Sequence, residues 1–185
     1  MSGRMVMRVK AGIAKFMVCN LFTVMFVTGA IQASNTKLQN SRWTTVETNG
    51  IPAPRHENAF VECGGKFYLI GGRGVKPVCE YDPQTKTWKD RNPVPIEMHH
   101  FQAVAVDSVI YVVGAMTGKY PVEQPLSHIY IYNPRSDSWQ KGAEIPVERR
   151  RGGCGAVLYN NKIYMVGGIK LGHTAAQLTH LMLTI

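Results

Sequence analysis

A short strand-like pattern closed by small residues occurs three times and constrains the fold of this chain more than any other feature. The copies are Lys66–Gly72, Val109–Ala115 and Lys162–Gly168. Their central tyrosines lie 43 and 53 residues apart. A β-branched and aromatic run that stops at glycine indicates a strand ending in a turn or bulge. A strand repeat with a period near fifty residues indicates the blades of a β-propeller.

Other landmarks recur in the same order around these strands. Two turn-forming units, Tyr81–Thr85 and Tyr132–Ser136, each place Asp-Pro or Asn-Pro after a tyrosine. In such units the short polar side chain bonds the turn backbone while proline fixes φ. Each of the three tryptophans, Trp43, Trp88 and Trp139, comes shortly before a proline-bearing turn. The repeat is therefore defined by several landmarks in register.

The order Arg-His, apolar run, Tyr-x-x-Gly-Gly, Tyr-Asp-Pro-x-Thr and Trp resembles the Kelch repeat, from about Trp43 to Gly168. This resemblance implies antiparallel four-stranded blades that close into a propeller. We expect an all-β fold, a partial Kelch-type β-propeller of about two and a half four-stranded blades within residues 34–172. Trp43 should mark a further outer strand. The other strands are expected near 57–63, 66–71, 77–81, 86–90, 101–106, 109–114, 128–132, 137–141, 154–159 and 162–167.

Residues 1–33 have the layout of a signal peptide. A basic start precedes the largely apolar run Phe16–Ala30, and Ala33 offers a small-residue cleavage site. We expect the chain to be secreted or periplasmic. The run is short for a membrane span. An uncleaved signal anchor is the alternative, and only in that case would the chain be bound to a membrane.

The segment 173–185 matches none of the repeat landmarks. It has no charge, proline, glycine or tryptophan, although a further Tyr-Asp-Pro unit is due there. A capping segment is one interpretation, but a cap should present a polar outer face. We favour the interpretation that the reading frame is lost near His173, so that the chain is a fragment of a longer propeller. Self-association of the open propeller would then cover its exposed blade faces.

Charge and cysteine content exclude some classes of site. The formal net charge is +9, but four of the basic residues lie in the leader, and no continuous basic stripe suits nucleic acid. After Cys19 in the leader, the cysteines are Cys63, Cys79 and Cys154, with no zinc-ligand spacing. Cys63 and Cys154 are expected as small buried residues. A Cys63–Cys79 bridge stays open for an oxidising compartment.

Strand direction places the polar residues on one rim. In an antiparallel blade, the residues before the first strand and after the second strand lie on the same face. We call this face the first-strand rim and expect the ligand there. Its candidate binding residues are Arg55, His56, Glu57, Arg73, His99, His100, Tyr120, Glu123, Arg149 and Arg151. The opposite rim, with Gly64-Gly65, Asp107-Ser108 and Asn160-Asn161, shows only turn residues.

Each candidate also has a purely structural interpretation. Arg55 and Arg151 can bond backbone carbonyls of a neighbouring blade. His56 or His99 fits a buried, hydrogen-bonded imidazole better than a metal ligand. His99 and His100 are adjacent on an expected strand, so they should point to opposite faces and not share one ligand. We therefore expect no metal and no cofactor. The remaining cationic face suits an anionic or polyhydroxyl ligand.

Two classes of function follow. The first is a non-catalytic Kelch module that binds a protein or a carbohydrate, and it does not bind nucleic acid. The alternative is a sugar-active enzyme that resembles the sialic acid mutarotases or the galactose oxidases. An acid/base pair for the former would come from Arg55, His56, Glu57 and Arg73. The Cys, Tyr and His set of a copper site cannot be picked out here. Catalytic residues are thus unknown, and we favour binding over catalysis.

Overall fold

The computed structural model describes residues 42–170 and 180–184. The chain divides into two compact units, Met1–Val46 and Glu47–Ile185. Of the first unit only residues 42–46 are described, and they are exposed and outside any strand. The expected signal peptide, 1–33, and residues 173–179 of the non-matching segment lie outside the described residues.

The first repeat forms a sheet of four antiparallel strands in sequence order. Its strands are β1 (Asn58–Cys63), β2 (Lys66–Gly71), β3 (Pro77–Asp82) and β4 (Thr87–Pro93). The β1–β2 turn is Gly64-Gly65, and both glycines have positive φ. The expected bounds of these strands differ from the observed ones by at most three residues, which confirms one full four-stranded blade.

The second repeat forms an equivalent four-stranded sheet that carries an insertion. Its strands are β5 (Gln102–Val106), β6 (Val109–Val113), β9 (His128–Asn133) and β10 (Ser138–Glu144). Between β6 and β9 the chain forms a small hairpin, β7 (Met116–Thr117) and β8 (Gln124–Pro125). This hairpin accounts for the longer spacing between the second and third tyrosines.

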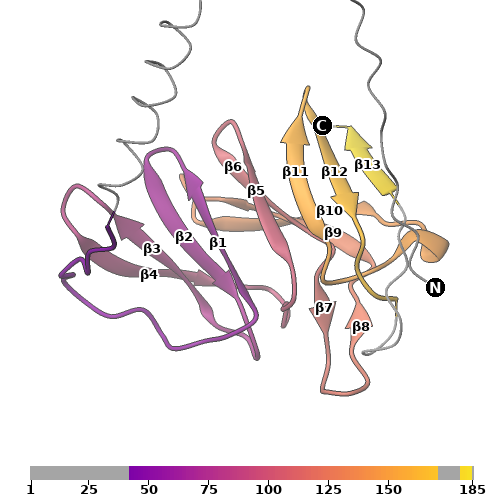
Figure 1. Ribbon diagram of the computed structural model, residues 1–185, viewed down its shortest axis with the longest axis horizontal. Coiled ribbons are helices and arrows are strands. Elements are labelled where there is room, and N and C mark those ends of the chain that lie inside the picture. The colour runs from indigo at the N-terminus through magenta and orange to yellow at the C-terminus, as the bar shows by residue number, and fades with distance from the viewer. Residues whose placement is uncertain (1–41, 171–179, 185) are drawn as a thin grey trace, which may run out of the picture. The chain divides into compact units, whose positions relative to one another are not determined.

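The third sheet has three described strands, β11 (Gly155–Tyr159), β12 (Lys162–Val166) and β13 (His180–Thr184). A short 3-10 helix, η1 (Val147–Arg149), precedes it. β13 comes from the segment that lacks repeat landmarks, and it pairs antiparallel with β12. Figure 1 shows β1, β5 and β11 side by side as the first strands of three successive sheets. The all-β, partial propeller expected from the sequence is confirmed.

The core lies between the sheets, because each sheet presents apolar side chains to its neighbour. Ile70, Tyr68 and Val78 of the first sheet pack with Ile110 and Tyr132 of the second. A second cluster joins Val104, Val113 and Ile129 to Ile163 and Met165 of the third sheet. Tyr68 and Tyr132 meet edge to face, with ring centroids 6.2 Å apart. Tyr68 is therefore an inter-blade packing residue.

The prediction for Trp43 is wrong. Trp43 is fully exposed, and residues 42–48 form no strand. Only Asn49 makes a bridge, a parallel one with Thr87 of β4. A strand needs a neighbour to share its backbone hydrogen bonds, so a favourable local sequence alone does not form one. Trp88 and Trp139 instead stack within their own blades, on Tyr81 and Tyr132.

The cysteines are buried free thiols. Cys63, Cys79 and Cys154 form no disulfide with one another, so the Cys63–Cys79 bridge is absent. Cys79 instead donates to Asp90 Oδ1 at 3.2 Å and accepts from Arg55 Nη2 at 3.1 Å. Within residues 42–170 and 180–184 no helix has the length and apolar character to cross a membrane.

Candidate functional site at the first-strand rim

One backbone position before the first strand of each blade has a left-handed conformation. The residues at this position are Glu57, His100 and Gly153, with φ of 58°, 50° and 68°. The backbone N–H of His100 donates to the Glu57 carbonyl at 2.9 Å, and that of Gly153 donates to the His100 carbonyl at 2.7 Å. These bonds join the inner edges of three successive blades. They bring side chains from different blades into contact.

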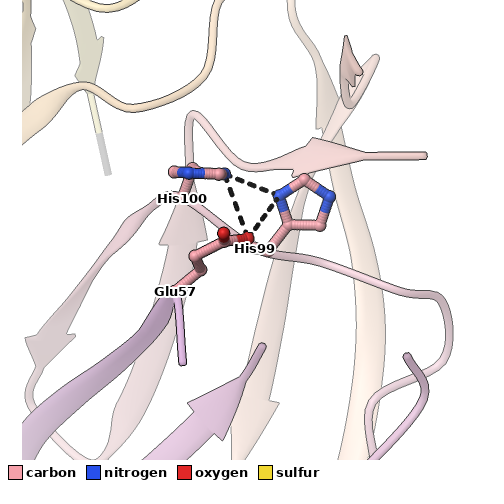
Figure 2. A group of neighbouring side chains, drawn as sticks. All are labelled: Glu57, His99 and His100. Carbon is pink, nitrogen blue, oxygen red and sulfur yellow. Dashed lines mark hydrogen bonds and ion pairs between the residues drawn. The ribbon is translucent and has the colours of Figure 1, made fainter. Parts of the chain in front are cut away.

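His99 and His100 converge, contrary to the prediction that they point to opposite faces. Their Nδ1 atoms lie 2.8 Å apart, as Figure 2 shows. The prediction assumed an extended strand, but His100 has a positive φ and β5 begins only at Gln102. Side chains alternate between two faces only where the backbone is extended. The left-handed residue cancels that alternation.

Glu57 completes a three-residue cluster with the two histidines. Its Oε2 lies 3.5 Å from His100 Nδ1 and 3.7 Å from His99 Nδ1. The same oxygen is buried and forms an ion pair with Arg73 Nε at 2.5 Å. Burial opposes ionisation of Glu57, but Arg73 and His100 outweigh it and hold the pKa of this carboxyl below its usual value. Glu57 is therefore an anion in the cluster.

Arg73 holds the inserted hairpin against the first blade. Its guanidinium pairs with both Glu57 and Glu123, and Nη1 donates to the Gly118 carbonyl at 2.9 Å. Burial acts against the charged form, but the two carboxylates raise the pKa of Arg73 above its ordinary value. Glu97 adds a second link, because its carboxylate accepts from Gly74 N at 2.8 Å and from Gly118 N at 3.2 Å.

His99 is completely buried beneath this network. Its Nε2 faces the Gly118 carbonyl at 3.2 Å and Glu97 Oε1 at 3.5 Å. Arg73 Nη1, which is a donor, also lies 3.3 Å from Nε2, so this nitrogen faces two acceptors and one donor. Burial lowers the pKa of His99, so the imidazole is neutral near pH 7.

Arg55 and Arg151 have a structural role at equivalent positions of the first and third blades. Arg55 Nη1 donates to the carbonyls of Gly71 at 3.1 Å and Pro77 at 2.9 Å. Arg151 is 2% exposed, and its Nη1 donates to Gly167 at 3.4 Å. These acceptors belong to each arginine's own repeat, whereas carbonyls of a neighbouring blade were expected. The second blade has Met98 at this position.

The remaining candidates are exposed on the same rim. The side chain of His56 is 72% exposed, with Nδ1 3.3 Å from Glu57 Oε1. Tyr120, at the tip of the inserted hairpin, is 69% exposed. Arg149 is exposed in η1. The structure thus divides the predicted set into a connected inner network and an accessible outer group.

The opposite rim, for which only turn residues were predicted, also has a cavity lined by charged side chains. A cavity of about 340 Å³ lies there, lined by Tyr68, Lys66, Glu80 and Arg91 among others. Glu80 is buried and accepts from Lys66 Nζ at 2.7 Å, while Arg91 Nη2 donates to the Pro134 carbonyl at 2.6 Å. A glutamate, Glu80, within the otherwise apolar run of β3 is the feature of the sequence that could have indicated this charged group.

Comparison with known proteins gives a consistent family. A model of the KLHDC2/KLHL20/DRC7 Kelch-repeats domain matches residues 31–181. Mouse Kelch-like protein 35 is 31% identical over 124 residues, which cover 64% of this chain and 20% of that protein. The Kelch-like protein terF of Aspergillus terreus is 27% identical over 150 residues, 69% of this chain and 31% of that protein. The chain therefore spans about a fifth to a third of these relatives.

A solved structure supports the same fold. The protein described as "Structure of YjhT" superposes with a TM-score of 0.58 at 21% identity, over 66% of this chain and 37% of that one. At this level of identity the likeness concerns the fold alone. Together with the domain match across most of the sequence, it places the three sheets in one known architecture. The chain belongs to the Kelch-repeat family, and its sheets are blades of a Kelch-type β-propeller.

Proposed function

We propose that this chain is a protein-binding Kelch module that takes its partner on the first-strand rim. Kelch-repeat domains generally mediate protein–protein binding. The observation that carries the proposal is a group of exposed apolar side chains on two linked loops of this rim. Val75 is 60% exposed, Tyr120 69% and Val122 66%. Aromatic and apolar side chains of this kind supply the energetic centre of protein interfaces.

The loops that carry these side chains are held in place before any partner arrives. Arg73 bonds to Gly118 and Glu123, and Glu97 accepts N–H groups from Gly74 and Gly118. Binding to a preorganised surface loses less conformational entropy than binding to a mobile one. Lys119 lies exposed beside Tyr120, so a partner with an apolar centre and an acidic edge fits this rim.

Affinity purification with matched variants tests this proposal. The tagged chain is incubated with extract of its own cells as wild type, as Tyr120→Ser/Val122→Ser, and as Arg135→Ser on the opposite rim. We expect partners that wild type and Arg135→Ser retain and that the rim variant loses. Partners lost only with Arg135→Ser, or held equally by all three, would remove the first-strand rim from recognition. Circular dichroism confirms that each variant is folded.

The sugar-active alternative has one supporting contact, the 3.3 Å pair between His56 and Glu57. An acid/base pair needs an enclosed sugar to act efficiently, and His56 is largely open to solvent. We propose this activity only as the second candidate. Exchange of N-acetylneuraminate anomers, followed by NMR, should match buffer for the wild type. Exchange that is accelerated by wild type and lost in His56→Ala would establish the enzyme instead.

Export and self-association stay predictions. We propose a secreted or periplasmic location, and the measurement is the intact mass of the chain from each cell fraction, which should begin at Ser34 outside the cytoplasm. Apolar side chains of β1 and β11, Phe60, Val157 and Tyr159, are exposed. We propose that these faces support self-association, which sedimentation velocity would detect as a concentration-dependent shift from the monomer mass.

A further inference from the structure

Three side chains of residue types that can bind a metal ion, from two blades, lie together on the first-strand rim. Glu57, His99 and His100 each offer a ligand atom within 4.8 Å of the others. The separations are 2.8 Å between the two Nδ1 atoms, and 3.5 and 3.7 Å from these to Glu57 Oε2. We propose that Glu57, His99 and His100 bind one divalent transition-metal ion, with zinc as the best fit. This inference is independent of the proposed function.

The distances suit a small ion. A circle through the three ligand atoms has a radius of about 2.0 Å, close to the usual Zn–N and Zn–O distances of about 2.0–2.2 Å. An ion near the centre of that circle would touch all three atoms with little movement of the side chains. Figure 2 shows the two rings and the carboxylate facing this common point. Calcium, with ligands at about 2.3–2.6 Å and a preference for oxygen, fits poorly.

The surroundings of the His99 ring allow coordination through Nδ1. With its ring proton on Nε2, His99 would donate toward Gly118 O and Glu97 Oε1, and its Nδ1 lone pair would point into the cluster. Metal-bound histidines commonly donate their other ring N–H to a carbonyl or carboxylate in this way. The short contact with His100 Nδ1 requires one proton between the rings. On metal binding, each neutral ring would carry its one proton on Nε2, which leaves both Nδ1 lone pairs for the ion and releases no proton from a neutral ring.

Charge around the cluster favours a dication. Among the described groups that contact the cluster or Arg73 are the carboxylates of Glu57, Glu97 and Glu123, the guanidinium of Arg73 and the imidazole of His56. The carboxylates outnumber the guanidinium by two. A divalent ion would neutralise this excess in a partly buried site, where unbalanced charge is costly. Two imidazoles and one carboxylate select zinc, copper, nickel or iron over magnesium and calcium.

The site is confined to the junction of the first two blades. Glu57 and His100 occupy equivalent positions of the first and second repeats, but the third repeat has Gly152 and Gly153 where the second has His99 and His100. The fold itself therefore does not require these side chains. Because His100 and Glu57 are partly exposed, a fourth position stays open to water or to a donor from a partner.

Zinc chloride titrated into the full chain after chelator treatment tests the site by isothermal calorimetry, with metal content measured by mass spectrometry. We expect one zinc per wild-type chain, and X-ray absorption should show only nitrogen and oxygen ligands, which excludes the cysteines. His100→Asn, which keeps a residue that tolerates positive φ, and Glu57→Gln should each weaken binding at least about tenfold. His128→Ala, outside the cluster, should bind as wild type does.

Three results would overturn the site: no stoichiometric zinc in wild type, a sulfur ligand shell, or wild-type affinity in a folded His100→Asn or Glu57→Gln variant. Circular dichroism shows which variants are folded, and either of the two suffices. Failure of zinc binding leaves the partner-capture result unaffected, and loss of partner capture leaves the zinc titration unaffected. The two proposals are therefore tested separately.

Discussion

The backbone N–H of His100 donates to the carbonyl oxygen of Glu57 at 2.9 Å, and the two residues hold the same position in successive blades. Both have left-handed backbone conformations. This bond brings a carboxylate of the first blade beside an imidazole of the second. The left-handed backbone position recurs in each repeat, but the carboxylate and imidazole side chains of the polar cluster occur together at the junction of the first two blades.

Substitution of Gly71 should destabilise the fold far more than substitution of Gly65. Both glycines have positive φ, 72° and 78°. A Cβ at Gly71 would overlap the carbonyl oxygen of Met98 and lie 2.7 Å from a ring carbon of Phe101, whereas nothing lies within 4 Å at Gly65. Gly65→Ala should cost about 1 kcal/mol of unfolding free energy and Gly71→Ala at least about 3 kcal/mol. Denaturant titration measures both, and equal costs would contradict the steric explanation.

Loss of Arg73 should leave two carboxylates without their cation. Glu123 is buried, and Glu57 Oε2 depends on the same guanidinium. Arg73→Met should lower the unfolding free energy by about 3 kcal/mol, because breaking a buried pair leaves uncompensated charge. Arg73→Met/Glu123→Leu should recover part of that loss. Arg135→Met on the exposed opposite rim is the control, and an equal effect there would refute this account.

Asp137 should stabilise the junction of the first two blades in a pH-dependent way. Burial alone would raise the pKa of Asp137, but donors from Tyr132 Oη at 2.7 Å and Asn92 N at 2.9 Å outweigh burial and hold it below its usual value. The pKa of Asp137 is lower in the folded chain than in the unfolded chain, where it is about 3.9, so the ionised carboxylate stabilises the fold at pH values above about 3.9. That stabilisation is lost as the pH falls through the pKa of the folded chain.

The comparison of Asp137→Asn with wild type tests this dependence. Asn tolerates the positive φ of this residue, so the backbone should be unaffected. The variant should be less stable by about 1.5 kcal/mol at pH 6, and the difference should shrink toward pH 3. Asp107→Asn, an exposed turn residue that also has positive φ, should change little at either pH. A constant difference for Asp137→Asn across this range would exclude the ionised carboxylate as its source.

The buried thiols should resist alkylation in the folded chain. Burial raises the pKa of Cys154 to about 11 and also raises the pKa values of Cys63 and Cys79. Only the thiolate reacts, so maleimide at pH 8 should label none of the three until guanidinium is added. Mass spectrometric mapping reads out each site, with an introduced Ser108→Cys on the exposed turn as the reactive control. Rapid labelling of native Cys154 would contradict its burial.

Local patterns predicted most of the strands of this chain. The repeated run at Tyr68, Tyr111 and Tyr164 gave the strand positions, because β-branched residues, glycine turns and Asn-Pro or Asp-Pro units act over a few neighbouring residues. The prediction of a strand at Trp43 was wrong because a strand depends on a neighbouring strand as well as on its own residues. The rim was also predicted from strand direction, and the structure places Arg73, Glu123, Glu57, His99 and His100 in one contacting network there.

The sequence by itself determined the repeat, the strand order and the rim on which the polar residues gather, because these follow from periodicity and chain direction. Only the tertiary structure decided which side chains meet. The left-handed φ of His100 turned its ring toward His99, and packing of two blades brought Glu57 beside residues more than forty positions away. Such a conformation is imposed on Glu57 and His100 by bonds between blades, and no local preference of glutamate or histidine encodes it.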